Sequence, residues 1–173
     1  MSKKDIDIDK FHIPRWNELP NVDLYLDQVV NFINSTLSPY IFLNNDKKDE
    51  NIQILTKTMI NNYVKNNLIE APEKKLYSKI QLAKLFAICI LKQVYSMQDI
   101  KTLISISLEN STAEEKYDCF CDLFEECLRY TFHQKDFVDN KTENSHLLKT
   151  VLLSCSYKIY VQNVTAKENS INK

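Results

Sequence analysis

Residues 55–104 read LTKTMINNYVKNNLIEAPEKKLYSKIQLAKLFAICILKQVYSMQDIKTLI, and they contain three segments of helical spacing, each preceded by a hydroxyl side chain. Thr56, Ser78 and Ser96 are residue types that accept a hydrogen bond from the first turn of a helix. Gln81 and Asp99 follow the two serines by three residues, which is the spacing of a capping box. The pattern predicts three helices, over about 56–67, 78–95 and 96–108.

The first of these helices has two chemically different faces. Its apolar face consists of Met59, Ile60, Tyr63 and Val64. Asn67 follows where the chain must turn into the left-handed conformation, which asparagine tolerates better than most residues other than glycine. We therefore predict that Asn67 directs the chain out of this helix. The second helix carries apolar residues on more than one side, which predicts a buried central helix or, alternatively, the wall of a ligand pocket.

The chain of 173 residues contains no glycine, although average usage would place about twelve there. Phosphate-binding loops, nucleophile elbows and calcium loops all need glycine for positive φ or for close approach of the backbone. These enzyme and nucleotide-binding classes are therefore excluded. We expect no enzymatic activity and no cofactor.

The rest of the chain predicts a mainly α-helical fold with four regions. Residues 1–20 are polar and form an N-terminal arm, and residues 21–108 combine a helix over 23–37 with the three capped helices. Two further amphipathic stretches, around Tyr117–Thr131 and Leu147–Ile159, make residues 109–164 a C-terminal helical region. Residues 165–173 are expected to be a frayed tail.

Charge is distributed unevenly along the chain. Residues 51–108 carry eight basic and three acidic side chains, a net charge of +5, whereas the segments on either side each carry a net charge of −3. A basic segment inside an acidic protein indicates a module that binds a polyanion. The acidic pairs Glu114–Glu115 and Glu125–Glu126 are interpreted as a solvated helix face.

Five cysteines form no even disulfide framework, and the first ten residues lack the apolar core of a signal peptide. We expect a cytoplasmic protein with no membrane association. Cys119, Cys121, Cys127 and His133 suggest a zinc site, but Cys121 and Cys127 fall on the apolar face of a predicted helix. Core packing is the interpretation that we prefer, and we expect no metal.

Residues 55–104 resemble the DNA-binding head of MerR-type regulators, with a recognition helix, a wing that is at most a minimal β-hairpin, a capped helix, and a further helix that begins at a serine. Together with LPNVDLYLDQVVNFIN (19–34), they resemble the bacterial family of unknown function numbered 1836, which is described as MerR-like. The resemblance implies that Ile60 and Tyr63 are core residues, that Asn61 and Asn62 face phosphates, and that Lys75 and Tyr77 belong to the wing. No helix directly precedes Thr56, so residues 23–37 would supply the first helix of the head.

The resemblance and the basic segment predict a DNA-binding transcriptional regulator with a recognition helix over about 57–66. Asparagine can pair with adenine through two hydrogen bonds, and lysine can reach guanine or phosphate. We expect double-stranded DNA and a second copy of the chain as partners, and the resemblance names no small-molecule effector. The alternatives are a solvated helix face and a non-enzymatic protein-interaction module on a winged-helix frame. The predicted DNA-contact residues are Lys57, Thr58, Asn61, Asn62, Lys65, Lys74, Lys75, Tyr77 and Lys79.

Overall fold

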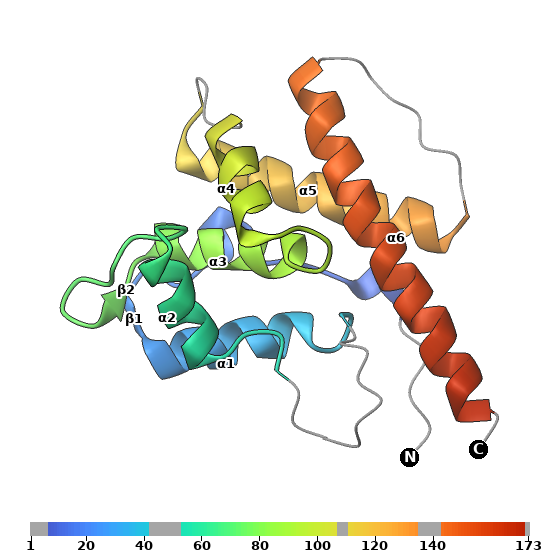
Figure 1. Cartoon of the computed structure of the whole chain (residues 1–173), viewed down its shortest axis with the longest axis horizontal. Helices are drawn as coiled ribbons and strands as arrows, with labels where there is room; N and C mark the ends of the chain where they lie inside the picture. The colour runs from blue at the N-terminus through green and yellow to red at the C-terminus, as the bar shows by residue number, and fades with distance from the viewer. Residues whose placement is uncertain (1–6, 42–52, 107–110, 135–142, 172–173) are drawn as a thin grey trace.

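The structure is a computed structural model that describes residues 7–41, 53–106, 111–134 and 143–171. These residues form six α-helices and a two-stranded antiparallel sheet (Figure 1). The mainly helical class predicted from the sequence is confirmed. The elements are two short 3₁₀ helices (Ile8–Lys10 and Trp16–Glu18), β1 (Leu24–Tyr25), α1 (Leu26–Leu37), α2 (Lys57–Lys65), β2 (Leu76–Tyr77), α3 (Lys79–Leu91), α4 (Met97–Ile106), α5 (Ala113–Phe132) and α6 (Glu143–Ile171).

Side-chain hydrogen bonds confirm the three predicted helix starts. The Thr56 hydroxyl accepts a hydrogen bond from the Met59 amide, so it caps α2. Ser78 and Ser96 cap α3 and α4 with reciprocal bonds to the residue three positions on, Gln81 and Asp99 respectively. These caps satisfy amide groups that have no partner inside the helix. The helix α4 ends at Ile106, and residues 107 and 108 lie outside the described residues.

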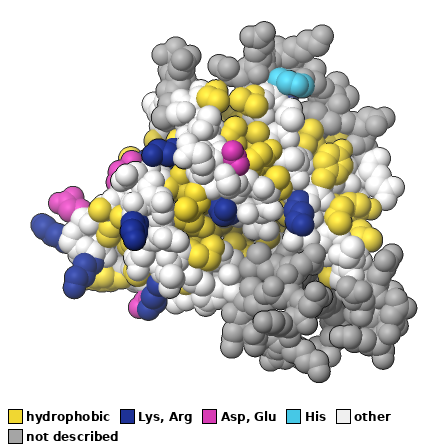
Figure 2. Space-filling view, in the orientation of Figure 1, with side chains coloured by type: hydrophobic (Ala, Val, Ile, Leu, Met, Phe, Trp, Pro, Cys, Tyr) yellow, Lys and Arg dark blue, Asp and Glu magenta, His cyan; other side chains and the backbone are white. Residues whose placement is uncertain are grey.

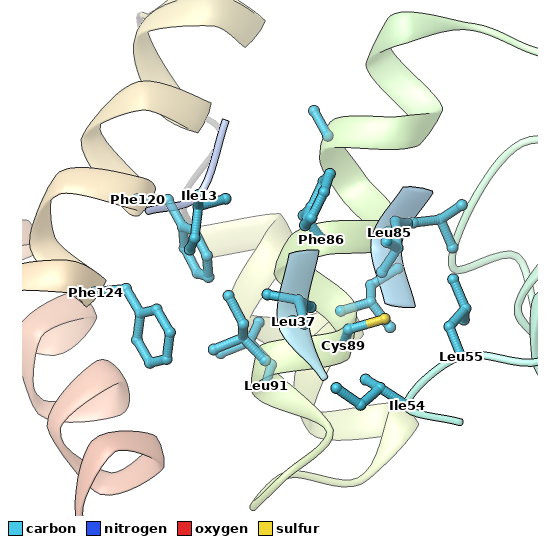
Figure 3. Close-up of a cluster of buried hydrophobic side chains, with 14 of the residues drawn as sticks. Ile13, Leu37, Ile54, Leu55, Leu85, Phe86, Cys89, Leu91, Phe120 and Phe124 are labelled. Carbon is cyan, nitrogen blue, oxygen red and sulfur yellow. The ribbon is translucent and has the colours of Figure 1, made fainter. Parts of the chain in front are cut away.

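The helix α3 lies at the centre of the fold and packs against α1, α5 and α6. Its predicted apolar residues on more than one side are all buried: Leu82, Leu85, Phe86, Cys89, Ile90 and Leu91. Figure 3 shows Phe86 and Cys89 between Phe120 and Phe124 of α5 on one side and Leu55, just before α2, on the other. Removal of this apolar surface from water is the main driving force that holds the surrounding helices on α3.

The small sheet joins two segments that are far apart in the sequence. Strand β2 pairs with β1, with Leu24 opposite Tyr77 and Tyr25 opposite Leu76. As a result, α1 begins at Leu26 and not at Asp23 as predicted. A strand of two residues is too short to show an alternating pattern, so the sequence revealed neither strand β1 nor its pairing.

The N-terminal segment, of which residues 7–20 are described, packs on α5 and is not a free polar arm. The carboxylate of Glu125 accepts hydrogen bonds from the Ile13 amide (2.8 Å) and, through both of its oxygens, from the Arg15 guanidinium (2.7 and 2.9 Å). About two turns earlier in α5, Asp118 accepts a hydrogen bond from the Trp16 amide (2.7 Å). Four apolar side chains of the segment enter the core as well: Ile8, Phe11, Ile13 and Leu19.

This docking corrects the interpretation of Glu125–Glu126 as a solvated face. Glu125 is only 5% exposed, because the N-terminal segment covers it. Burial alone would raise the pKa of the Glu125 carboxyl, but the hydrogen bonds from Arg15 and Ile13 and the charge of Arg15 lower it further than burial raises it. Glu125 is therefore a charged structural residue and not a surface one.

The long helices α5 and α6 pack against each other, and α6 crosses α5 in the view of Figure 1. Their inner faces bury Cys121, Cys127 and Cys155 together with aliphatic and aromatic neighbours. The backbone of α6 stays helical through Ile171, where the sequence predicted a frayed tail from Thr165. Within the described residues, no helix combines the length and the apolar composition that a membrane span requires.

Candidate nucleic-acid interface

The helix α2 has one buried and one exposed face. Ile60 is fully buried and Tyr63 is 3% exposed, so the predicted apolar face packs into the core. The opposite face is open to solvent. It carries Lys57, Thr58, Asn61, Asn62 and Lys65, which are all exposed. The structure therefore brings five of the nine predicted contact residues together on one helix face.

Both ends of α2 are closed by local hydrogen bonds. Asn67 adopts a φ of 55°, which confirms the predicted left-handed residue. The Asn67 amide donates to the Val64 carbonyl and the Leu68 amide donates to the Tyr63 carbonyl, at 3.0 and 2.9 Å. This pair of bonds is the Schellman motif that ends many helices. It leaves the last turn of α2 well defined, which keeps Lys65 on the exposed face.

The first helix α1 positions α2 through one side chain. The Asn34 amide group donates to the Leu55 carbonyl (2.7 Å), and its oxygen accepts from the Leu55 amide (3.1 Å). The Asn34 side chain thus pairs with both backbone groups of Leu55, the residue immediately before the Thr56 cap, as a residue of a neighbouring β-strand would. Between α1 and α2 in the sequence stand residues 42–52, which lie outside the described residues. The helix α1 packs directly against α2.

An acidic residue of α1 lies against the exposed face. Asp27 forms an ion pair with Lys57, and both side chains are more than half exposed. Such surface pairs contribute little to stability, but this one partly neutralises the first lysine of α2. The sequence does not predict the contact of Asp27 with Lys57, because the two residues are thirty positions apart and belong to different helices. Lys65, at the other end of α2, has no ion pair with any described residue.

A tight turn before β2 carries two more of the predicted residues. The Leu76 amide donates to the Glu73 carbonyl (2.8 Å), and the two residues between them have positive φ, 49° at Lys74 and 70° at Lys75. This is the arrangement of a type I′ turn, in which Asn-Gly is the usual sequence. Left-handed backbone costs about 1 kcal/mol or more for each lysine. Lys and Arg side chains lie at the left-hand tip of the molecule, in the region of this turn (Figure 2).

Two predicted contact residues do not join this surface. Tyr77 is 3% exposed and lies in the core, so its assignment to DNA contact is corrected to a packing role. Lys79 is half-buried, and its ammonium group lies 2.9 Å from the Asn21 side-chain oxygen and 5.3 Å from the centre of the Trp16 ring. That cation–π contact and hydrogen bond direct Lys79 towards the N-terminal segment.

Some of the lysines that contribute to the net charge of +5 in residues 51–108 already have partners. Lys84 forms an ion pair with Glu70 (2.5 Å) and lowers the pKa of that carboxyl. Lys92 donates to the Tyr95 carbonyl. Among the predicted contact residues, this leaves Lys65, Lys74 and Lys75 as exposed lysines without an ion pair to any described residue. The candidate interface is therefore α2 and the Glu73–Leu76 turn, not the whole basic segment.

The cysteine and histidine residues of α5 are not gathered into a ligand set. Cys121 and Cys127 are fully buried in the core, as the packing interpretation predicts, whereas Cys119 is exposed. His133 lies at the end of α5, where its Nε2 is 2.9 Å from the Asp9 carboxylate. No group of three or more potential metal ligands occurs in the part of the chain that the structure describes.

The fold and this surface define a mainly helical protein with a two-stranded sheet and an exposed helix rich in asparagine and lysine. A family model described as a domain of unknown function, DUF1836, matches residues 14–127, and the chain belongs to this family. The match begins at Pro14, within the N-terminal segment, and it spans the candidate interface, the central helix and most of α5. No curated protein and no solved structure matches the chain.

Proposed function

We propose that the protein binds double-stranded DNA as a MerR-like winged helix-turn-helix regulator, with α2 as the recognition helix. The observation that carries this proposal is the exposed face of α2, which presents two asparagines and two lysines on a helix whose opposite face is anchored in the core. A single helix of this kind fits the major groove. There Asn61 and Asn62 can pair with adenine while Lys57 and Lys65 contact guanine or phosphate.

The turn at Lys74 and Lys75 supports the same proposal. Two lysines in left-handed conformations destabilise a turn that Asn-Gly would form without strain. Strain that persists at an exposed charged tip is a feature of binding sites. We assign these lysines to the DNA backbone beside the groove that α2 enters, in the role of a short wing.

We also propose that two copies of the chain bind DNA as a dimer. Tyr157 and Val161 on α6 are 56% and 53% exposed, and with Val164 they form a stripe at spacings of four and three residues. This is the spacing of a helix that packs along another helix. A two-fold dimer would place two α2 helices on paired half-sites, which is the usual way for such proteins to gain specificity.

The rival function is a non-enzymatic protein-interaction module. The same α6 stripe favours it, because exposed apolar side chains in a row mark contact surfaces for proteins in general. The Asp27–Lys57 ion pair also favours it, since it removes positive charge from the proposed DNA face. The two functions differ in their dependence on salt, because only phosphate contacts release counterions from DNA.

The deciding experiment measures binding to a mixture of genomic DNA fragments at several salt concentrations. DNA binding predicts that log affinity falls linearly with log salt, with a slope near −0.9 for each phosphate contacted. The double variant Lys57→Ala, Lys65→Ala should bind at least about tenfold more weakly and show a shallower slope by about two. The matched control Lys101→Ala, Lys158→Ala removes two exposed lysines from α4 and α6 and should leave both quantities unchanged. A flat salt profile, or equal losses in the two double variants, contradicts the proposal.

A further inference from the structure

A groove lies where α3, α4, α5 and the first turns of α6 meet, and its volume is about 520 Å³. This is within the range of about 300–1,000 Å³ that is typical of small-molecule sites. Its lining is predominantly apolar, with Leu103 and Ile106 from α4, Phe120 from α5 and Leu147 from α6. In the space-filling view, hydrophobic side chains gather on the face that α4 and α6 present (Figure 2).

The central helix explains why the space is hollow. On its other sides α3 fills the core with leucine, isoleucine and phenylalanine. Towards the groove it presents two alanines one turn apart, Ala83 and Ala87, between the larger lining residues Ile80 and Leu91. Larger side chains at these two positions would occupy the space. Ile80, Ile106 and Leu147 stand at the edge of the groove and are 40 to 48% exposed. Apolar side chains around a hollow of this kind mark a binding site.

The polar groups at the edge differ in whether they already have partners. The Glu115 carboxylate accepts hydrogen bonds from the amide and hydroxyl of Thr112 at the start of α5, so it is committed to the helix cap. Lys84 is paired with Glu70. Lys116 forms no hydrogen bond or ion pair with any described residue. Its charge helps to lower the pKa of the neighbouring Glu115 carboxyl, after the hydrogen bonds from Thr112. The groove therefore offers an apolar lining and one cationic group, Lys116, that is not held by a hydrogen bond or ion pair to a described residue.

We propose that this groove binds a small amphipathic anion, with a hydrocarbon or aromatic body on the apolar lining and a carboxylate or similar head group at Lys116. Charge complementarity selects the anion, since a carboxylate can form an ion pair with the half-buried Lys116 at the edge of the groove and a neutral ligand cannot. The proposal does not depend on DNA binding. It assigns a defined site to the alternative interpretation of α3, in which this helix forms the wall of a ligand pocket.

Cys119 provides a reporter for occupancy. It lines the groove and is exposed, whereas Cys89, Cys121, Cys127 and Cys155 are buried. N-ethylmaleimide should therefore modify one thiol quickly in the folded protein. Dodecanoate below its micelle concentration is the probe, and we expect saturation to slow the modification of Cys119 by about tenfold or more. If saturating dodecanoate leaves the rate of Cys119 modification unchanged in the folded wild-type protein, the proposal is overturned.

Two pairs of variants separate the apolar lining from the charge. Ala87→Leu fills the groove and should abolish protection of Cys119, while the control Ala71→Leu, in an exposed loop outside the groove, should retain it. In calorimetric titration, Lys116→Gln should weaken the binding of dodecanoate about tenfold. It should leave the binding of dodecanol unchanged, because the alcohol carries no charge that could pair with Lys116. Lys101→Gln should change neither. Circular dichroism verifies that each variant is folded. Equal dodecanoate affinity in Lys116→Gln and Lys101→Gln overturns the assignment of Lys116, and protection that survives in Ala87→Leu overturns the assignment of the groove.

Discussion

The helices α2 and α5 are built alike, but their polar faces have different neighbours. Each begins at a threonine cap, each buries an apolar face, and each carries a row of polar side chains on the other side. In α5 that row is partly covered, because the N-terminal segment lies on Asp118 and Glu125. In α2 the corresponding row is open to solvent. Two helices with similar patterns therefore serve different purposes, one as an internal scaffold and one as a candidate contact surface.

The largest expected effect concerns the anchor of α2. Tyr63→Ala removes a buried aromatic ring and should lower the free energy of unfolding by about 3 kcal/mol. Tyr63→Phe is the matched variant. Burial raises the pKa of the Tyr63 hydroxyl, which has no hydrogen-bond partner among the described residues, so its removal should cost no stability. Urea unfolding measures both variants. Similar stability in Tyr63→Ala and Tyr63→Phe would mean that α2 is not anchored through this ring.

The next effect tests the covered face of α5. Arg15→Met leaves the buried carboxylate of Glu125 without its charged partner, and we expect a loss of about 2 kcal/mol at pH 7. The folded pKa of Glu125 is lowered, so its contribution is present above the ordinary glutamate value of about 4.3. The contribution is lost as the pH falls through the folded pKa.

The pH dependence provides the control for this pair. Unfolding at a series of pH values should show the wild type losing its advantage over Glu125→Gln below the ordinary glutamate pKa. A difference between the two proteins that is the same at pH 7 and at pH 3 would show that the charge on Glu125 does not stabilise the docked segment.

A smaller effect of opposite sign concerns the turn beside α2. Replacing the pair by Lys74→Asn and Lys75→Gly introduces the sequence that type I′ turns favour, and it should raise the free energy of unfolding by about 1 kcal/mol. The same double variant should lower DNA affinity, because two positive charges are lost. Thermal unfolding and fluorescence anisotropy test the two parts separately. A more stable variant with unchanged DNA affinity would show that the turn does not belong to the DNA interface.

The smallest effect compares the two polar faces directly. Lys65→Ala on the open face of α2 should change stability by no more than about 0.5 kcal/mol. Asp118→Ala on the covered face of α5 should cost about 1 kcal/mol, because the Trp16 amide loses its acceptor. Chemical denaturation of the two variants side by side measures the difference. If Lys65→Ala is the more destabilising of the two, the open and covered faces have been assigned the wrong way round.

Much of the local structure was predictable from the residues themselves. The hydroxyl caps at Thr56, Ser78 and Ser96 and the left-handed Asn67 are confirmed, because each depends on atoms within a few positions along the chain. The apolar faces of α2 and α3 are confirmed for the same reason, since helical spacing alone places those side chains together. The mainly helical fold follows from these elements.

Contacts across long sequence separations could not be predicted in this way. The pairing of β1 with β2 involves strands of two residues, and the bond between Ile13 and Glu125 joins residues 112 positions apart. Tyr77 was expected at the surface and lies in the core because β2 places it opposite Leu24. The ion pair of Asp27 with Lys57 likewise depends on how α1 packs against α2.

The sequence by itself determined where α2, α3 and α4 begin, which sides of α2 and α3 are apolar, and which residues carry the positive charge. Those properties depend on capping hydrogen bonds, on the helical repeat and on composition, which all act locally. The tertiary structure alone decided which polar faces remain open, which lysines have partners, and where alanines of α3 leave a groove. These depend on which elements become neighbours when the whole core is buried, because a polar face is solvated or covered according to its neighbour and not according to its own residues.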